Sequence, residues 1–186
     1  MIRSKSNRID TKTLVFASFL VGINLILTRV LVFMMVDGSV RASIGNIPLI
    51  LSGLLLGPLA GLMTGIVSDL VGFLLNSHGF PFHPGFTLSS GLTGFIPGIV
   101  VLIGSHFGKN RYSLANVITA NLVVYLLVSG LLNTWWLTHI IGTGFWVLLP
   151  VRLASHGVIT FINTLLIYAL VKSFQRTGLV SDNALN

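Results

Sequence analysis

The chain has 186 residues, of which 53% are hydrophobic and only 8% are charged, whereas soluble domains carry about 25% charged residues. Its mean hydropathy is +0.93, and so little polar surface cannot cover a water-soluble globule. The absence of cysteine excludes a disulfide framework, a thiolate metal site and a cysteine nucleophile. The net charge of +7 comes from basic residues scattered along apolar segments and at their edges. We therefore interpret that charge as a topology signal rather than a nucleic-acid-binding surface, and predict an integral membrane protein.

Six apolar stretches are candidates for membrane spans, each of which needs about 20 apolar residues. In chain order they are Thr13–Val36, Ile44–Leu56, Pro58–Leu75, Phe86–Phe107, Leu114–Ile141 and Val147–Ser173. The second is short and ends at Gly57-Pro58, where proline suits the first position of the next helix, so a half-inserted segment is the alternative there. The sequence thus predicts an all-α membrane protein, with a six-helix transmembrane domain at residues 13–173. Residues 1–12 and 174–186 are expected to be cytoplasmic segments.

Basic residues orient these spans because Lys and Arg are enriched in cytoplasmic loops. When the six spans are threaded alternately, eight basic residues fall on one side of the membrane. These are Arg3, Lys5, Arg8, Lys12, Lys109, Arg111, Lys172 and Arg176. The other side keeps Arg41 in a loop, with Arg29 and Arg152 inside spans. We therefore expect both termini in the cytoplasm.

Several polar residues inside the spans are predicted toward the outer side of the membrane. Charged residues within the hydrocarbon are energetically costly and are usually functional. Arg29, Asn133 and Arg152 are all predicted in the outer third, and Asp69 lies nearer the middle of the third span. The loop at residues 76–85 joins the third and fourth spans at the same level and is rich in aromatic residues. Together these residues predict an outward-opening pocket for a ligand that is flat, to stack on aromatic rings, and anionic, to pair with arginine.

Each of these residues also has a purely structural interpretation. Arg29 and Arg152 can extend to the outer headgroups, and tryptophans at this height are typical of an interfacial belt. Asp69 can tie the third span to a neighbouring helix. His83 remains open between a binding and a structural role, since it lies in a loop rich in proline and aromatic residues.

Small residues at spacings of four predict close contacts between helices, because helices in lipid associate through tight packing. Gly53, Gly61 and Gly65 in the second and third spans are interpreted as packing within the bundle. Ser18 and Gly22 form a separate small face on the first span.

Motifs for chemistry are missing from the sequence. There is no Gly-rich nucleotide loop followed by Lys and Ser or Thr, no HExxH and no carboxylate pair. Ser90 lacks the glycine two residues earlier that is usual in intramembrane serine proteases, since Leu88 occupies that place. We therefore expect no enzyme, no catalytic residue, no metal and no cofactor. A proton-coupled porter would need more membrane carboxylates than Asp69 alone.

Two parts of the chain resemble a known family. The segment Gly45–Pro58, followed by the glycine-rich stretch Gly61–Gly72 with Asp69, resembles the substrate-binding subunits (S components) of energy-coupling factor (ECF) vitamin importers. The block Phe82–Ser89, which reads FHPGFTLS, and the segment Asn133–Leu137, which reads NTWWL, resemble the folate-specific branch of that family. The similarity runs from about Lys12 to Lys172.

The resemblance implies a six-helix S component that captures folate from outside at the bacterial plasma membrane. It implies docking on a membrane coupling subunit driven by two ATPases, through the small face at Ser18 and Gly22, where the family usually has alanines. Arginine would pair with the carboxylates of folate, Trp135 and Phe86 would stack on its rings, and Asn133 and Thr87 would bond to a polar edge. The candidate ligand-binding residues are Arg29, Arg41, Asp69, His83, Pro84, Phe86, Thr87, Asn133, Trp135 and Arg152.

Two alternatives remain at this point. One is an S component for another flat vitamin or a nucleobase-like compound. The other is a self-sufficient porter that needs no partner subunits. Which arginine meets which end of the ligand is left open by the sequence.

Overall fold

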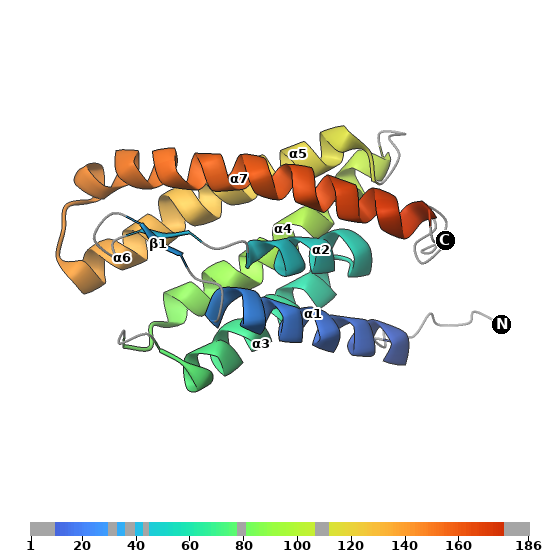
Figure 1. Ribbon diagram of the computed structural model, residues 1–186, viewed down its shortest axis with the longest axis horizontal. Coiled ribbons are helices and arrows are strands. Elements are labelled where there is room, and N and C mark those ends of the chain that lie inside the picture. Colours follow the sequence, from blue (N-terminus) through green and yellow to red (C-terminus); the bar gives the residue numbers. More distant parts are fainter. Residues whose placement is uncertain are drawn as a thin grey trace.

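The computed structural model describes residues 10–29, 33–35, 40–42, 45–77, 81–106 and 112–176, with the backbone alone described at 33–35 and 40–42. Its elements are α1 (Thr11–Arg29), β1 (Phe33–Met35), β2 (Val40–Ala42), α2 (Asn46–Leu56), α3 (Pro58–Leu75), α4 (Pro84–His106), α5 (Leu114–Val123), the π-helix η1 (Val124–Leu132), α6 (Asn133–Ile141) and α7 (Phe145–Arg176). Helices α5, η1 and α6 follow one another without a break, and Figure 1 shows them as one rod beside α7.

Five of these helical rods are long and apolar enough to cross a membrane. They are α1, α3, α4, the α5–η1–α6 rod and α7, and α2 is a sixth, shorter apolar helix. Their outward surfaces carry apolar side chains such as Phe19, Leu74 and Phe161, which are 62%, 82% and 68% exposed. The prediction of an all-α membrane protein is confirmed, and the chain is a multi-pass membrane protein.

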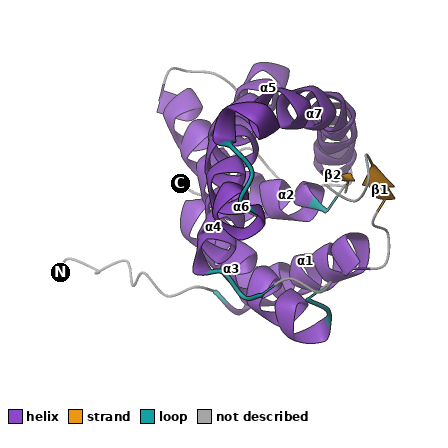
Figure 2. Cartoon of the chain, turned by 90° about the vertical axis from the view of Figure 1, so that its left-hand side faces the viewer, coloured by secondary structure: helices purple, strands orange, loops and turns teal. Residues whose placement is uncertain are grey.

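The short second span is explained by where it lies. With 11 residues and about 1.5 Å of rise per residue, α2 is about 16 Å long, half of a bilayer core. Every residue from Ile47 to Leu54 is buried, and α2 packs against α1, α3, α4 and α7. Figure 2 shows it in the middle of the bundle. Other helices, rather than lipid, therefore surround α2.

The first span was expected to continue to Val36, and this part of the prediction is wrong. Helix α1 ends at Arg29, and Phe33–Met35 form a strand paired antiparallel with Val40–Ala42. In the register Met35 faces Val40, and the residues between them in the sequence include Asp37-Gly38, a dipeptide typical of tight hairpins. An apolar run followed by such a turn signal therefore suits a strand as well as a helix.

Glycines set the spacing of α2, α3 and α4. A Cβ atom on Gly53 or Gly61 would overlap the carbonyl oxygen of Gly94, and one on Gly65 would overlap the carbonyl of Ser90. Three helices therefore touch backbone to backbone, as the small-residue pattern predicted.

The apolar core cluster and the candidate ligand-binding residues of the spans lie toward different ends of the bundle. The core is built around Leu54, Val101, Val117, Ile167 and Val171, all at most 1% exposed. They belong to the later parts of α2, α4 and α7 and to the first half of α5. Figure 1 shows that the start of α1 and the end of α7 share one end of the molecule. The opposite end, where α3 and α6 finish and α4 begins, holds Arg29, Asn133 and Arg152, while the buried amides Asn116, Asn121 and Asn163 lie away from it.

Candidate ligand-binding site

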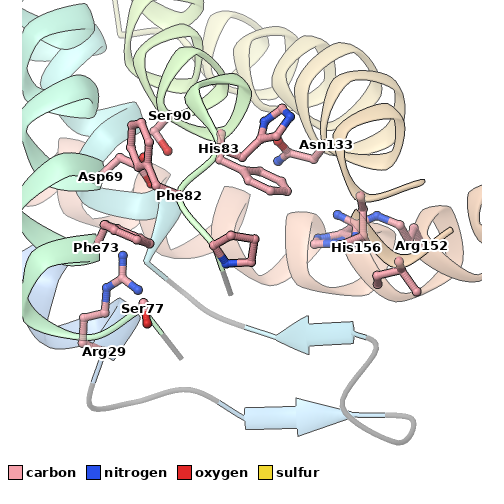
Figure 3. Close-up of a pocket in the computed structure, with 14 residues that line it drawn as sticks. Arg29, Asp69, Phe73, Ser77, Phe82, His83, Ser90, Asn133, Arg152 and His156 are labelled. Atoms are coloured by element: carbon pink, nitrogen blue, oxygen red, sulfur yellow. The ribbon is translucent and has the colours of Figure 1, made fainter. Parts of the chain in front are cut away.

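A cavity of about 300 Å³ opens at this polar end of the bundle. Five helices contribute to its walls: α1, α3, α4, α6 and α7. The lining residues are Arg29, Asp69, Phe73, Ser77, Pro81, Phe82, His83, Phe86, Ser90, Asn133, Leu137, Ile141, Arg152 and His156. Its volume is at the lower end of the range for small-molecule sites, about 300–1,000 Å³. Figure 3 shows Arg29 and Asp69 on one side of the cavity and Arg152 and His156 on the other.

Asp69 supplies the carboxylate of the α3 wall. Its Oδ2 accepts a hydrogen bond of 2.7 Å from Oγ1 of Thr87, three residues into α4. Thr87 itself does not line the cavity. Its hydroxyl holds the carboxylate from behind, and Asp69 keeps acceptor capacity for a ligand because an ionised carboxylate has about four lone-pair sites.

Arg29 is held by the end of α3. Its Nη1 donates a hydrogen bond of 2.6 Å to the backbone carbonyl of Asn76, the residue that follows the last turn of α3. The guanidinium lies so close to Gly72 that a Cβ atom there would contact it. A cation at a helix C-terminus is favourable. Arg29 therefore ties α1 to α3 as well as lining the cavity.

Arg152 on α7 has no such arrangement. It is 9% exposed, and within the described part of the chain its Nε has no hydrogen-bond partner, as is also true of Nε of Arg29. Nε2 of His156, one helical turn further along α7, and Oδ1 of Asn133 on α6 are also buried without a partner among the described residues. A buried charge is costly unless it is paired. This wall therefore favours an anionic group.

Aromatic rings separate the two polar walls. The ring centroids of His83 and Trp136 are 5.3 Å apart, and those of His83 and Phe86 are 5.8 Å apart. Nδ1 of His83 accepts a hydrogen bond of 3.1 Å from the backbone N–H of Gly85, which leaves the proton of the neutral ring on Nε2. A flat ligand between the polar walls would meet ring edges and faces.

The structure brings six of the ten candidate residues to the cavity. They are Arg29, Asp69, His83, Phe86, Asn133 and Arg152. Pro84 is the first residue of α4, a position that suits proline, and Thr87 lies behind Asp69. Trp135 does not line the cavity: it is 51% exposed and packs on His139 and Phe145. The side chain of Arg41 lies outside the described residues, and its backbone pairs with Met34 in the hairpin.

Sequence reasoning missed eight lining residues. His156 follows Arg152 by four positions, and Leu137 and Ile141 follow Asn133 by four and eight, so helical periodicity was the available signal. Ser77, Pro81 and Phe82 belong to the loop already singled out. Phe73 follows Asp69 by four positions and Ser90 follows Phe86 by four, so the same helical periodicity was available for them.

The small face of α1 is open. Ser18 and Gly22 are both exposed, and a Cβ atom on Gly22 would meet nothing within 4 Å. The hydroxyl of Ser18 bonds back to the carbonyl of Leu14, at 2.9 Å. This face therefore differs from the glycines of α2–α4, whose space is already filled.

A bundle of membrane helices with a half-polar cavity at one end defines a membrane-embedded protein that binds a small molecule. The family model "ECF transporter, substrate-specific component" matches residues 12–175. The chain belongs to this family, whose members are substrate-binding subunits of transporters and not enzymes.

Comparison with individual proteins agrees with the family. The chain is 28% identical over 171 residues to "Folate transporter FolT" of Clostridium novyi (strain NT), covering 92% of this chain and 94% of that relative. The solved structure "Crystal structure of FolT bound with folic acid" superposes with a TM-score of 0.71 at 27% identity, covering 89% of this chain and 95% of the other. A second structure, "Structure and mechanism of the S component of a bacterial ECF transporter", has a TM-score of 0.61 at 20% identity over 90% and 95% of the two chains, and supports the fold alone.

Proposed function

We propose that this S component binds folate. Two similarities support the proposal: the relative named a folate transporter and the structure solved with folic acid both align over nearly the whole chain. Folate combines a flat pterin, an aromatic linker and a glutamate with two carboxylates. The cavity offers a carboxylate, aromatic rings and, in Arg152, a cation whose Nε has no partner among the described residues. Another flat vitamin without carboxylates would leave Arg152 unpaired.

The observation that carries the proposal is the buried, unpartnered Nε of Arg152. Nε of Arg29 also lacks a partner among the described residues, but Nη1 of Arg29 already donates to Asn76 and Arg29 is less buried than Arg152. Arg152 is therefore the better partner for the glutamate carboxylates, with His156 beside it. Asp69 is an acceptor on the opposite wall, suited to the N–H and amino groups at the edge of the pterin. In this orientation the linker crosses the region of His83 and Phe86.

Arg152→Ala tests this orientation when two ligands are compared. Loss of a charge-assisted hydrogen bond costs about 1.5–3 kcal/mol, or roughly 10- to 150-fold in folate affinity. Pteroic acid lacks the glutamate, so we expect its affinity to change far less in the same variant. Isothermal titration calorimetry of both ligands gives the comparison, and Arg176→Ala, at the far end of α7, is the matched control. Equal losses for the two ligands, or a folate loss of less than about threefold, would reject the clamp.

We also propose that the protein delivers folate by docking on a membrane coupling subunit driven by two ATPases. The open face at Ser18 and Gly22 supports a contact with another transmembrane helix. Proteoliposomes that hold this chain alone should bind folate without ATP-driven uptake, and uptake should appear when the coupling subunit and ATPases are added. Concentrative uptake by the lone chain would favour a self-sufficient porter instead.

The orientation in the bacterial plasma membrane is part of the same proposal, with both termini cytoplasmic and the cavity facing outward. The distribution of Lys and Arg supports it. Because the chain has no cysteine, single replacements report cleanly. Asn76→Cys should react with an impermeant maleimide only from outside, and Arg176→Cys only from inside. Reaction of residue 176 from outside would reverse the assignment.

A further inference from the structure

The α5–η1–α6 rod changes from α-helical to π-helical hydrogen bonding at η1 and returns to α-helix in α6. In η1 the backbone N–H of Asn133 donates to the carbonyl of Val128, five residues earlier, whereas the N–H of Val124 at the end of α5 donates to Ala120, four residues earlier. A π-helix holds roughly 4.4 residues per turn against about 3.6 in an α-helix. The nine residues of η1 therefore make about two turns instead of about 2.5.

This difference decides which residues face inward beyond η1. The buried residues Val117, Val124 and Val128 mark the inner face of the rod. A continuous α-helix would place the next inward positions at about three, four and seven residues beyond Val128. The middle one, Leu132, is half-buried, and the other two are Leu131 and Trp135. Those two residues are 47% and 51% exposed.

The residues that do face inward fit two turns of π-helix. Asn133, nine positions after Val124, returns to the same face and lines the cavity. Leu137, one α-turn later, also lines it and is 9% exposed. Nine positions of α-helix would instead have put Asn133 on the side opposite Val124.

We propose that η1 is a positioning element that carries about two surplus residues and thereby turns α6 so that Asn133 and Leu137 line the ligand cavity. α5 packs its inner face on the apolar core, while α6 presents a different face to the cavity. The π-turns connect these two requirements within one unbroken rod. Tyr125, inside η1, fixes the segment to α7 through a hydrogen bond of 2.6 Å from its hydroxyl to the carbonyl of Leu153.

A pair of two-residue deletions tests the proposal. Removing Leu126 and Leu127, which are 46% and 48% exposed, leaves seven residues, and these make about two turns as ordinary α-helix. Asn133 then keeps its face, and we expect folate affinity within about threefold of the unmodified chain. The matched control removes Ile118 and Thr119, two exposed residues of α5. This segment is α-helical and has no surplus residues relative to an α-helix. That deletion turns the start of α5 by about half a turn and should cost more than about 100-fold in affinity.

The outcomes separate this inference from the proposed function on which its readout rests. A variant without Leu126 and Leu127 that fails to fold, or that loses folate as strongly as the control, overturns the role of η1. If the unmodified chain does not bind folate, the proposed function is rejected instead. The orientation of α6 is then tested independently by the quenching of tryptophan fluorescence. In single-tryptophan variants, lipids brominated close to the headgroup should quench Trp135 strongly and Trp136 weakly. A shielded Trp135 would contradict the rotation.

Discussion

At the scale of single residues, the cavity has a carboxylate and an arginine on one wall, Asp69 and Arg29, and a second arginine, Arg152, on the other. Asp69 is anchored by Thr87, and Nη1 of Arg29 by the end of α3. Within the described part of the protein the Nε atoms of Arg29 and Arg152 both lack a partner, and Arg152 is the more deeply buried of the two. Residues with satisfied partners cost little to keep in the apo protein. The unsatisfied atoms are the ones from which a ligand gains most, because binding removes an existing desolvation cost.

Asp69→Asn provides the residue-scale prediction. The amide keeps one acceptor but replaces the other oxygen with a donor, which opposes the N–H groups at the pterin edge. We expect a loss of about 1.5–3 kcal/mol, roughly 10- to 150-fold, for folate and pteroic acid alike. Calorimetric titration measures it, and Thr87→Val should show a smaller loss because that residue positions the carboxylate from behind. Unchanged affinity in Asp69→Asn would move the pterin to another wall.

Several site residues were predictable from the sequence because a charged or amide side chain inside a membrane is energetically costly and is usually functional. This cost identified Arg29, Asp69, Asn133 and Arg152, all of which the structure brings to one cavity. It could not reveal that Thr87 faces Asp69, since that depends on how α3 and α4 pack. Nor could it place Trp135. Asn133 and Trp135 are two positions apart, so they cannot both face inward on an α-helix, and η1 determines which of the two does.

At the scale of elements, glycine has two different uses in this bundle. Gly53, Gly61 and Gly94 lie in backbone contacts between α2, α3 and α4. Gly22 is open, on the exposed face of α1. The same sequence pattern therefore marks one contact inside the protein and one surface free for a partner. Only the packing distinguishes them, which is why the pattern alone was weakly specific.

The matched pair Gly22→Leu and Gly61→Leu tests that distinction. Leucine at position 61 would force its side chain against the backbone of Gly94, so we expect a loss of stability of at least about 1–3 kcal/mol and a clearly lower midpoint of thermal unfolding. Leucine at position 22 should leave unfolding and folate binding unchanged. It should reduce ATP-driven uptake in the assembled complex, because bulk prevents close approach of helices. Normal uptake with Gly22→Leu would place the partner contact elsewhere.

The elements themselves were predictable where hydropathy ran long, as in α3, α4 and α7, and less so where local context intervened. α1 was expected to reach Val36, but the strand pairing of Phe33–Met35 ends it early. η1 was not expected, because π-turns carry no simple hydropathy period. The end of α1 lies at the cavity, since Arg29 lines it, and η1 leads from the apolar core to Asn133, the next residue of the rod, which also lines the cavity.

At the scale of the whole molecule, the two halves of the bundle have different tasks. The half around Leu54 and Val101 is an apolar core. The other half leaves a cavity between five helices, lined by charged and aromatic side chains. The family match over residues 12–175 covers both halves.

Titration of the purified, detergent-solubilised chain with a panel of vitamins tests the central claim most directly. Intrinsic tryptophan fluorescence is a suitable signal, since Trp136 lies against His83 at the cavity. We predict saturable binding of folate at about one ligand per chain, with no saturation by riboflavin, thiamine or biotin at the same concentrations. Saturation by one of those three vitamins together with no response to folate would contradict the account.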